Sequence, residues 1–144
     1  MGSALHQQIK ISAVISAHNE ADQLADCLKT LGFVDEIVVL LDRCTDESDK
    51  IARLYTDQIF PGKWLTEGER RNDGIKFCSG EWIFEIDADE RVSEELADEI
   101  TAVIDKTTFD WHEIPVDNYI GNKLVRWGWG ASFGKAAYPG LFRK

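Results

Sequence analysis

The chain has 144 residues and a formal net charge of −10 at pH 7, with 44% hydrophobic and 29% charged residues. This length suits one domain with one core and is too short for two substrate-binding lobes. The negative charge argues against general nucleic-acid binding. The sequence contains no run of 18 apolar residues, so we expect no membrane-spanning helix.

The N-terminus shows no basic region followed by an apolar core, so we expect no secretory signal. The three cysteines, Cys27, Cys44 and Cys78, are odd in number and far apart in the sequence. That spacing argues against a disulfide framework or a zinc site and suits a reducing compartment. We expect a cytoplasmic protein in which Cys27 and Cys78 are small core residues.

Apolar, β-branched runs predict four strands in the first two thirds of the chain, at residues 9–17, 37–41, 58–60 and 82–86. Each predicted strand is followed by a helical pattern. In chain order the helix signals are the repeat of Leu24, Cys27, Leu28 and Leu31 ended by Gly32, the N-cap residue Thr45 before Ile51, Leu54 and Tyr55, the capping box of Thr66 and Glu69 with an end at Gly80, and Ser93 before Leu96, Ile100, Val103 and Ile104.

Strands and helices that alternate with short connections predict an α/β fold with a doubly wound, mostly parallel sheet flanked by helices. From Phe109 onward the pattern changes to extended segments, 112–119 and 123–129, with Gly-rich turns. We therefore expect one domain over residues 1–144, with a flexible N-terminus at 1–8 and a mixed or antiparallel β region at 109–144.

The fourth predicted strand ends abruptly in Asp87-Ala88-Asp89-Glu90, which places three carboxylates within four residues. In an extended chain Asp87 and Asp89 lie on one side and the small Ala88 on the other, so both carboxylates can face one ion. A buried strand that ends in two aspartates can present a divalent metal to a diphosphate at the edge of an open α/β sheet. The alternative is a solvated acidic turn.

The loops after successive parallel strands meet at the carboxyl edge of such a sheet. Residues 17–20, 42–46 and 87–90 should therefore line one crevice. Its carboxylates repel one another, so a divalent metal or the neighbouring Arg70 or Arg71 is needed to compensate their charge.

Several of these residues also have simpler interpretations. Asp42 is equally suited to a turn or cap, Arg71 to a solvated helix position, and His18 to a loop position rather than to a ligand. The sequence contains no G-x-G-x-x-G fingerprint, no Walker A lysine and no G-x-S-x-G elbow. Dinucleotide oxidoreductases, P-loop enzymes and serine hydrolases are therefore not expected.

Residues 119–144 contain five cations and no acid, interleaved with Trp127, Trp129 and Phe133. This mixture fits a surface that meets an anionic acceptor or the headgroup layer of a membrane. We therefore expect peripheral contact with the inner face of the membrane through this segment. The alternative is a β-hairpin whose aromatic side chains belong to the core.

Four blocks of the sequence resemble, in the same order, the family 2 glycosyltransferases, which have the GT-A fold. The blocks are residues 12–20 (SAVISAHNE), 35–46 (DEIVVLLDRCTD), 69–72 (ERRN) and 84–91 (FEIDADER). The last block, with LFRK at 141–144, is most similar to the branch that adds glucose or related sugars to bacterial lipopolysaccharide core. The resemblance implies a GT-A-like (Rossmann-like) donor-binding domain, truncated before the acceptor half, with residues 109–144 toward the acceptor side.

The resemblance also implies a role for each matched position. Asp42 would accept a hydrogen bond from the base, while Arg71 would hold the nucleotide and Asn72 would support its loop. The full set of implied nucleotide-sugar contacts is Ala17, His18, Asn19, Glu20, Asp42, Arg71, Asn72, Asp87, Ala88 and Asp89, of which Asp87 and Asp89 would also coordinate Mg2+ or Mn2+. One departure stands beside Asp42, where Arg43 and Cys44 replace the small residues usual in the family.

The implied activity is metal-dependent transfer of a sugar, with inversion, from a nucleoside-diphosphate sugar to a cell-envelope glycan or glycolipid. A UDP-sugar is the expected donor. Inverting members of the family use a carboxylate near the acceptor as general base. No Asp or Glu follows Asp117, so we assign no catalytic residue. The alternatives are a nucleotide-sugar-binding module that lacks the base and, more remotely, a receiver-like Mg-binding signalling domain. Homo-oligomer formation stays open.

Overall fold

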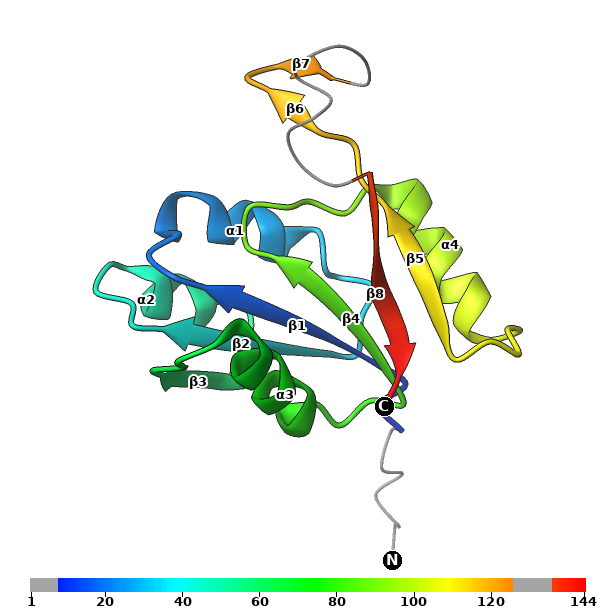
Figure 1. Ribbon diagram of the computed structural model, residues 1–144, viewed down its shortest axis with the longest axis horizontal. Helices are drawn as coiled ribbons and strands as arrows, with labels where there is room; N and C mark the ends of the chain where they lie inside the picture. Colours follow the sequence, from blue (N-terminus) through cyan, green and yellow to red (C-terminus); the bar gives the residue numbers. More distant parts are fainter. Residues whose placement is uncertain (1–7, 126–135) are drawn as a thin grey trace, which may run out of the picture.

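The computed structural model describes residues 8–125 and 136–144. Its elements in chain order are β1 (Ile11–Ala17), α1 (Ala21–Lys29), β2 (Glu36–Asp42), α2 (Ser48–Ala52), β3 (Ile59–Gly62), α3 (Glu67–Phe77), β4 (Trp82–Asp87), α4 (Glu94–Ile104), β5 (Trp111–Pro115), β6 (Tyr119–Ile120), β7 (Lys123–Leu124) and β8 (Ala137–Arg143). Six strands form one sheet in the order β3-β2-β1-β4-β8-β5, and β6 pairs with β7 in a hairpin that projects beyond it (Figure 1).

The sheet is parallel from β3 to β4 and becomes mixed beyond β4. Strands β3, β2, β1 and β4 run parallel, whereas β8 runs antiparallel to both of its neighbours, β4 and β5. The helices cover both faces, with α3 on one side and α1, α2 and α4 on the other (Figure 1). The predicted doubly wound, mostly parallel α/β fold is therefore confirmed.

Strands β1 and β4 lie in the interior of the sheet and contribute apolar side chains to both of its faces. Ile15 and Phe84 belong to the larger core cluster, under α1 and α4, while Val14 and Ile83 belong to the smaller cluster under α3. This two-sided burial explains why both strands are nearly continuous apolar runs in the sequence. Cys27 and Cys78 are buried as predicted, and burial raises the pKa of each thiol to about 12.

Helix α2 differs from the sequence prediction. It covers only Ser48–Ala52 and its N-cap is Glu47, not Thr45. The backbone N–H of Thr45 donates to Asn19 Oδ1 at 2.7 Å, so Thr45 is held in the loop by the neighbouring strand end. Leu54, predicted to lie on the buried face of this helix, is 79% exposed. A tertiary contact has therefore overridden the local capping signal.

Strand β8 lies in the predicted mixed or antiparallel β region, although its own bounds were not predicted. It contains Pro139 and Gly140, which are turn signals in a sequence. The strand nevertheless inserts between β4 and β5, and its register with β5 shifts by one residue between His112 and Ile114. The predicted extended segment 112–119 is not one strand, because it contains most of β5 and only the first residue of β6. Strand β7 covers only the first two residues of the predicted 123–129 segment, and residues 126–129 lie outside the described residues, as do residues 1–7 of the expected flexible N-terminus.

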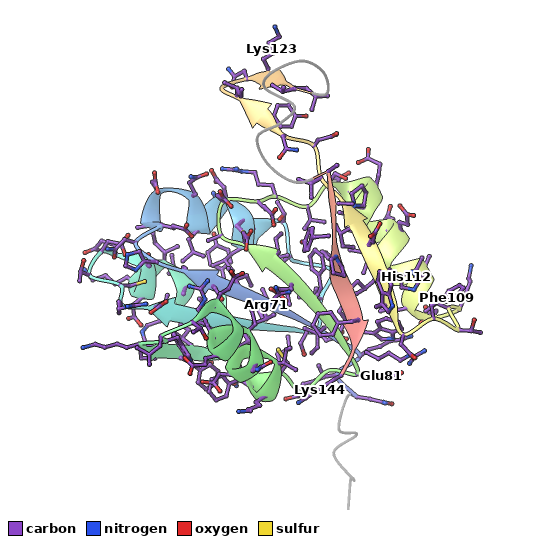
Figure 2. All side chains as sticks on the ribbon, in the orientation of Figure 1. Arg71, Glu81, Phe109, His112, Lys123 and Lys144 are labelled. Atoms are coloured by element: carbon purple, nitrogen blue, oxygen red, sulfur yellow. The ribbon has the colours of Figure 1, made fainter. Side chains whose placement is uncertain are left out.

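The described cations of residues 119–144 lie at opposite ends of the domain. Lys123 is on the β6–β7 hairpin, whereas Lys144 and its neighbour Arg143 lie beside the start of β4 (Figure 2). Arg143 pairs with Glu81 and stacks 4.5 Å from the ring centroid of Trp82. These three cations therefore do not form one continuous basic surface. Trp127, Trp129 and Phe133 lie outside the described residues. None of the helices in the described part of the chain has the length and apolarity needed to cross a bilayer.

Helix α3 approaches the sheet most closely at Gly74. A Cβ atom at this buried position would lie 2.8 Å from Val14 Cγ2 and 2.9 Å from Leu40 Cδ1. We expect Gly74→Ala to destabilise the protein by about 1–3 kcal/mol through overpacking, although alanine favours a helix by up to about 1 kcal/mol. Urea unfolding measures the free-energy difference.

Gly68 provides the matched control because it lies in the same helix with open space around the added Cβ. Gly68→Ala should be neutral or stabilising by up to about 1 kcal/mol. Equal effects of the two substitutions would contradict the close packing of α3 on the sheet.

Candidate functional site

Three loops meet at the carboxyl edge of the sheet, as the sequence predicted. Ser16 pairs with Asp87 across β1 and β4, and Ala17 pairs with Leu41 across β1 and β2, so the strands end side by side. The loop after β1 is tied to the loop after β2, because Asn19 Oδ1 accepts hydrogen bonds from two successive backbone N–H groups, at 2.7 and 3.3 Å. Residues 17–20, 42–46 and 87–90 therefore surround one crevice.

His18 also connects these two loops. Its Nδ1 lies 2.6 Å from the backbone oxygen of Asp42. A carbonyl oxygen only accepts hydrogen bonds, so Nδ1 carries the proton. Ala17 contributes its backbone oxygen, 3.3 Å from Cys44 Sγ. Ala17 and His18 therefore order the β1 end of the crevice, while the exposed His18 ring remains accessible to a ligand.

The described residues contain two non-glycine residues with positive φ, and both lie in this crevice. They are Asn19, with φ of 51°, and Arg43, with φ of 52°. The left-handed region is unfavourable for side chains other than glycine, and such residues concentrate at functional sites. The side chain of Asn19 bonds the loop after β2, and the side chain of Arg43 bonds Asp42 and Trp64 O.

Asp87 and Asp89 are exposed on either side of a buried alanine. Ala88 is 1% exposed and belongs to the core cluster. The strand ends at Asp87, and a turn follows in which Glu90 N donates to Asp87 O at 3.0 Å. The expected extended alternation beyond Asp87 is therefore wrong, although both carboxylates do reach the surface. The side chain of Ala88 packs inward, so only its backbone is available to a ligand.

Glu20 brings a third carboxylate to the aspartate pair. Burial raises the pKa of Glu20, and the negative charges of Asp89 and Asp87 raise it further. His18 and Arg70 oppose this effect. The crevice is therefore a place where added positive charge is favourable.

Asp42 is the most enclosed acid of the crevice, with a side chain 8% exposed. Its oxygens accept from Arg43 Nε at 2.9 Å, from Arg43 Nη2 at 3.3 Å and from Arg70 Nη1 at 3.2 Å. The hydrogen bond from Arg43 is the largest cause that lowers the pKa of Asp42 below its usual range, and the positive charges of Arg43 and Arg70 add to it. Asp42 is therefore ionised and held between two arginines.

We expect Asp42→Asn to destabilise the protein by about 2 kcal/mol at pH 7, because two guanidinium groups lose a charged acceptor. Since the folded-state pKa of Asp42 is lowered, its stabilisation is complete above about pH 5 and is lost as the pH falls below about 3.9 toward the folded value. Urea unfolding of both proteins between pH 3 and 7 should therefore show a difference that shrinks in acid. Asp57→Asn, at an exposed position, is the control. A difference that stays constant with pH would contradict this role.

The arginine that enters the crevice is Arg70, whereas the resemblance implies Arg71. Arg70 is 24% exposed and contacts Asp42. Arg71 extends from α3 toward β4 (Figure 2), where its Nε lies 2.8 Å from Glu85 Oε1. Burial raises the pKa of Glu85, and Arg71 opposes that effect. Asn72 is exposed on α3.

The sequence did contain a signal for Arg70. Gly74 is the residue of α3 that touches the sheet, and residues four apart share one face of a helix, so Arg70 faces the sheet too. The sequence analysis did not identify Glu85 as a residue near the site. It lies between Phe84 and Ile86 on the central strand and so points to the opposite face, where α3 lies.

A cavity of about 790 Å³ opens on the other side of the aspartate pair, between β4, α4 and the ends of β5 and β8. Its floor is apolar, from Phe84, Ile86, Leu96 and Ile114, and its rim includes Asp87, Asp89, Asp117, Asn118 and Tyr138. The hydroxyl of Tyr138 donates to the Glu85 carbonyl oxygen at 2.6 Å. The aspartate pair thus borders both the crevice and this partly apolar cavity.

Within the described residues, no group of three or more His, Cys, Asp or Glu side chains could hold a metal ion by itself. Two exposed aspartates fit a metal whose remaining ligands come from a bound phosphate and water, which is how Mg2+ is commonly held.

Residues 12–131 match the family model for glycosyl transferase family 2. An uncharacterised glycosyltransferase of Rickettsia felis is 36% identical over 92 residues, which cover 63% of this chain and 32% of that protein. The lipopolysaccharide core biosynthesis glycosyltransferase LpsC of Rhizobium meliloti is 32% identical over 107 residues, covering 69% of this chain and 40% of that protein. The chain thus spans well under half the length of these relatives.

The fold also matches solved structures. Residues 1–349 of S. aureus TarS align with a TM-score of 0.66 and 20% identity, covering 94% of this chain and 47% of that chain. The complex of the same protein with UDP-GlcNAc aligns with a TM-score of 0.62 and 22% identity, covering 81% of this chain and 37% of that chain. The likeness shows a shared fold.

The fold and crevice define an α/β domain of the glycosyltransferase class. The family match covers most of the sequence, and the chain belongs to glycosyl transferase family 2. This membership removes the receiver-like signalling domain from consideration.

Proposed function

We propose that this chain is the donor-binding part of a metal-dependent glycosyltransferase that uses a UDP-sugar. One observation carries the proposal. The carboxylates of Asp87 and Asp89 are exposed at the end of an interior strand and act electrostatically on Glu20 across the same crevice. A nucleoside diphosphate with a divalent cation supplies the positive charge that these acids need and the phosphate oxygens that complete the metal's ligands.

In the proposed complex, Asp87 and Asp89 would hold Mg2+ or Mn2+, and the ion would supply Lewis-acid stabilisation of the negative charge on the leaving diphosphate. Ala17, His18, Asn19 and Glu20 line the nucleoside side of the crevice. Arg70 takes the role first expected for Arg71, because it is the arginine that reaches the crevice acids. The transferred sugar lies toward the 790 Å³ cavity.

The acceptor we propose is a cell-envelope glycan or glycolipid, and the transfer inverts the anomeric centre. The similarity to LpsC supports this acceptor class. The protein would contact the inner face of the membrane through the β6–β7 hairpin. Tyr119 and Ile120 of this hairpin are each 60% exposed and lie beside Lys123. Aromatic and cationic residues together suit the headgroup layer of a membrane.

A second candidate is a nucleotide-sugar-binding module without turnover. In this candidate the proton-accepting carboxylate, which is unassigned within residues 118–144, plays no part. Donor hydrolysis or transfer separates the two candidates, because only a complete enzyme turns over.

Thermal unfolding tests the shared part of both candidates. UDP should raise the melting temperature only when Mg2+ or Mn2+ is present, since a ligand that binds the folded state stabilises it. UDP alone and metal alone are the controls. The absence of a shift with saturating UDP and metal together would refute the donor site.

A further inference from the structure

We propose that Tyr138 and Glu90 are positioning residues for the aspartate pair, because they hold the end of β4 on the side where no strand pairs with it. The inference rests on the proposed donor site and adds two residues that act through the backbone of β4. Tyr138 lies near the start of β8, and Glu90 closes the turn after β4. Loss of either contact should weaken metal-dependent UDP binding.

The end of β4 is paired with a strand on one side only. Toward β1 the pairing continues to Asp87, whereas toward β8 it stops at Phe84, and β4 and β8 then separate (Figure 1). Glu81 O accepts from Lys144 N on the β8 side. Backbone groups alternate in direction along a strand, so those of Glu85 and Asp87 face the same side. Beyond Phe84, no strand in the described part of the chain supplies their partners.

Two side chains take the place of the missing strand. The hydroxyl of Tyr138 donates to the carbonyl oxygen of Glu85 at 2.6 Å. The carboxylate of Glu90 accepts from the backbone N–H of Asp87 at 2.9 Å, and the N–H of Glu90 donates to the carbonyl oxygen of Asp87 at 3.0 Å. These reciprocal bonds close the turn that carries Asp89. Both aspartates are therefore attached to a strand end that side chains hold in place.

Gly140 makes room for the contact between Tyr138 and Glu85. The tyrosine ring lies over this glycine, two residues further along β8, where a Cβ atom would lie 2.7 Å from Cζ and 2.9 Å from Cδ2 of the ring. Cβ atoms do not approach ring carbons so closely, so a larger residue at position 140 would displace the ring. The ring also packs against the larger core cluster, which fixes its direction.

Tyr138→Phe in the whole chain tests the proposal. It keeps the ring, which lines the 790 Å³ cavity, and removes only the hydroxyl that holds Glu85. We expect UDP to bind about tenfold more weakly in the presence of Mn2+, the lower end of the range for groups that orient metal ligands. Calorimetric titration measures this change. The electron paramagnetic resonance spectrum of the bound Mn2+ should change too, because the carboxylates meet the ion in an altered geometry.

Gly140→Ala reaches the same contact by another route. The added methyl group should push the Tyr138 ring away from Glu85 and reproduce the loss of affinity. Tyr55→Phe is the matched control, since it removes the hydroxyl of another partly buried tyrosine that packs against the core. Tyr55 precedes Thr56, which bonds Ile37 O near the opposite end of the sheet. This control should leave the Kd unchanged.

Two substitutions of Glu90 separate its hydrogen bond from its charge. Glu90→Ala removes the acceptor of the Asp87 N–H and should weaken UDP binding by about tenfold. Glu90→Gln keeps an oxygen acceptor and loses the charge, so it should restore most of that affinity. A glutamine variant as weak as the alanine variant would show that Glu90 acts through its charge and would overturn its positioning role.

Hydrogen exchange of the unliganded protein measures the order of the strand end directly. The amides of residues 85–90 should exchange faster in Tyr138→Phe and Glu90→Ala than in the wild-type protein, and Tyr55→Phe should not change them. A purely structural role would lower the melting temperature and leave the Kd and the Mn2+ spectrum unchanged, because the variants stay folded at the titration temperature.

The outcomes separate this inference from the donor site. If the wild-type protein binds no UDP in the presence of Mn2+, the donor site is refuted and the positioning role with it. If the wild-type protein binds UDP and Tyr138→Phe binds it within about twofold, with the same Mn2+ spectrum, only the positioning role of Tyr138 is overturned.

Discussion

The Asp87→Asn/Asp89→Asn double variant should lose metal-dependent UDP binding. Each substitution keeps the shape of the side chain and removes a charged ligand, and a hydrogen bond or contact to a charged group contributes about 1.5–3 kcal/mol. Loss of two such contacts corresponds to roughly a hundredfold or greater increase in Kd. Calorimetric titration with UDP and Mn2+ measures the change, and the melting-temperature shift on adding both ligands should disappear.

The matched control is Asp98→Asn, which neutralises an exposed aspartate of α4. It should retain both the affinity and the melting-temperature shift. The unliganded melting temperature of the double variant checks that the fold persists. Removal of the two charges also removes two causes that raise the pKa of Glu20. Unchanged UDP affinity in the double variant would refute the proposed metal site.

The largest effect on stability is expected from Phe84→Ala. Phe84 is fully buried on β4, between Ala13 of β1 and Leu141 of β8, and its ring lies 5.9 Å from that of Phe33. Truncation of a buried phenylalanine loses apolar contacts and leaves a cavity, at a cost of about 3–5 kcal/mol. Urea unfolding gives this difference directly.

Phe109→Ala is the comparison, because Phe109 is 71% exposed. We expect its effect to stay within about 0.5 kcal/mol. Phe84 also forms part of the cavity floor beside the aspartate pair. Its truncation should therefore weaken donor binding as well. A loss for Phe84→Ala below about 1 kcal/mol would contradict the central position of β4 in the sheet.

The sequence predicted those parts of the candidate site that depend only on where each strand ends. Asp87 and Asp89 follow an apolar run, and parallel strands place their carboxyl ends together, so the crevice of three loops followed from the sequence. The sequence left open which of two adjacent arginines reaches the crevice. Arg70 and Arg71 are adjacent, and only the packing of α3 through Gly74 decides which one reaches Asp42.

The sequence alone determined the alternation of strands and helices, the buried central strands and the acidic strand ends. These features depend on local periodicity and on the burial of apolar side chains, which leave a direct pattern along the chain. The tertiary structure decided the insertion of β8 between β4 and β5, the shortening of α2 and the pairing of Arg43 and Arg70 with Asp42. These contacts join residues far apart in the chain, or select among adjacent side chains, so their energies depend on the assembled sheet and leave no periodic signal in the sequence.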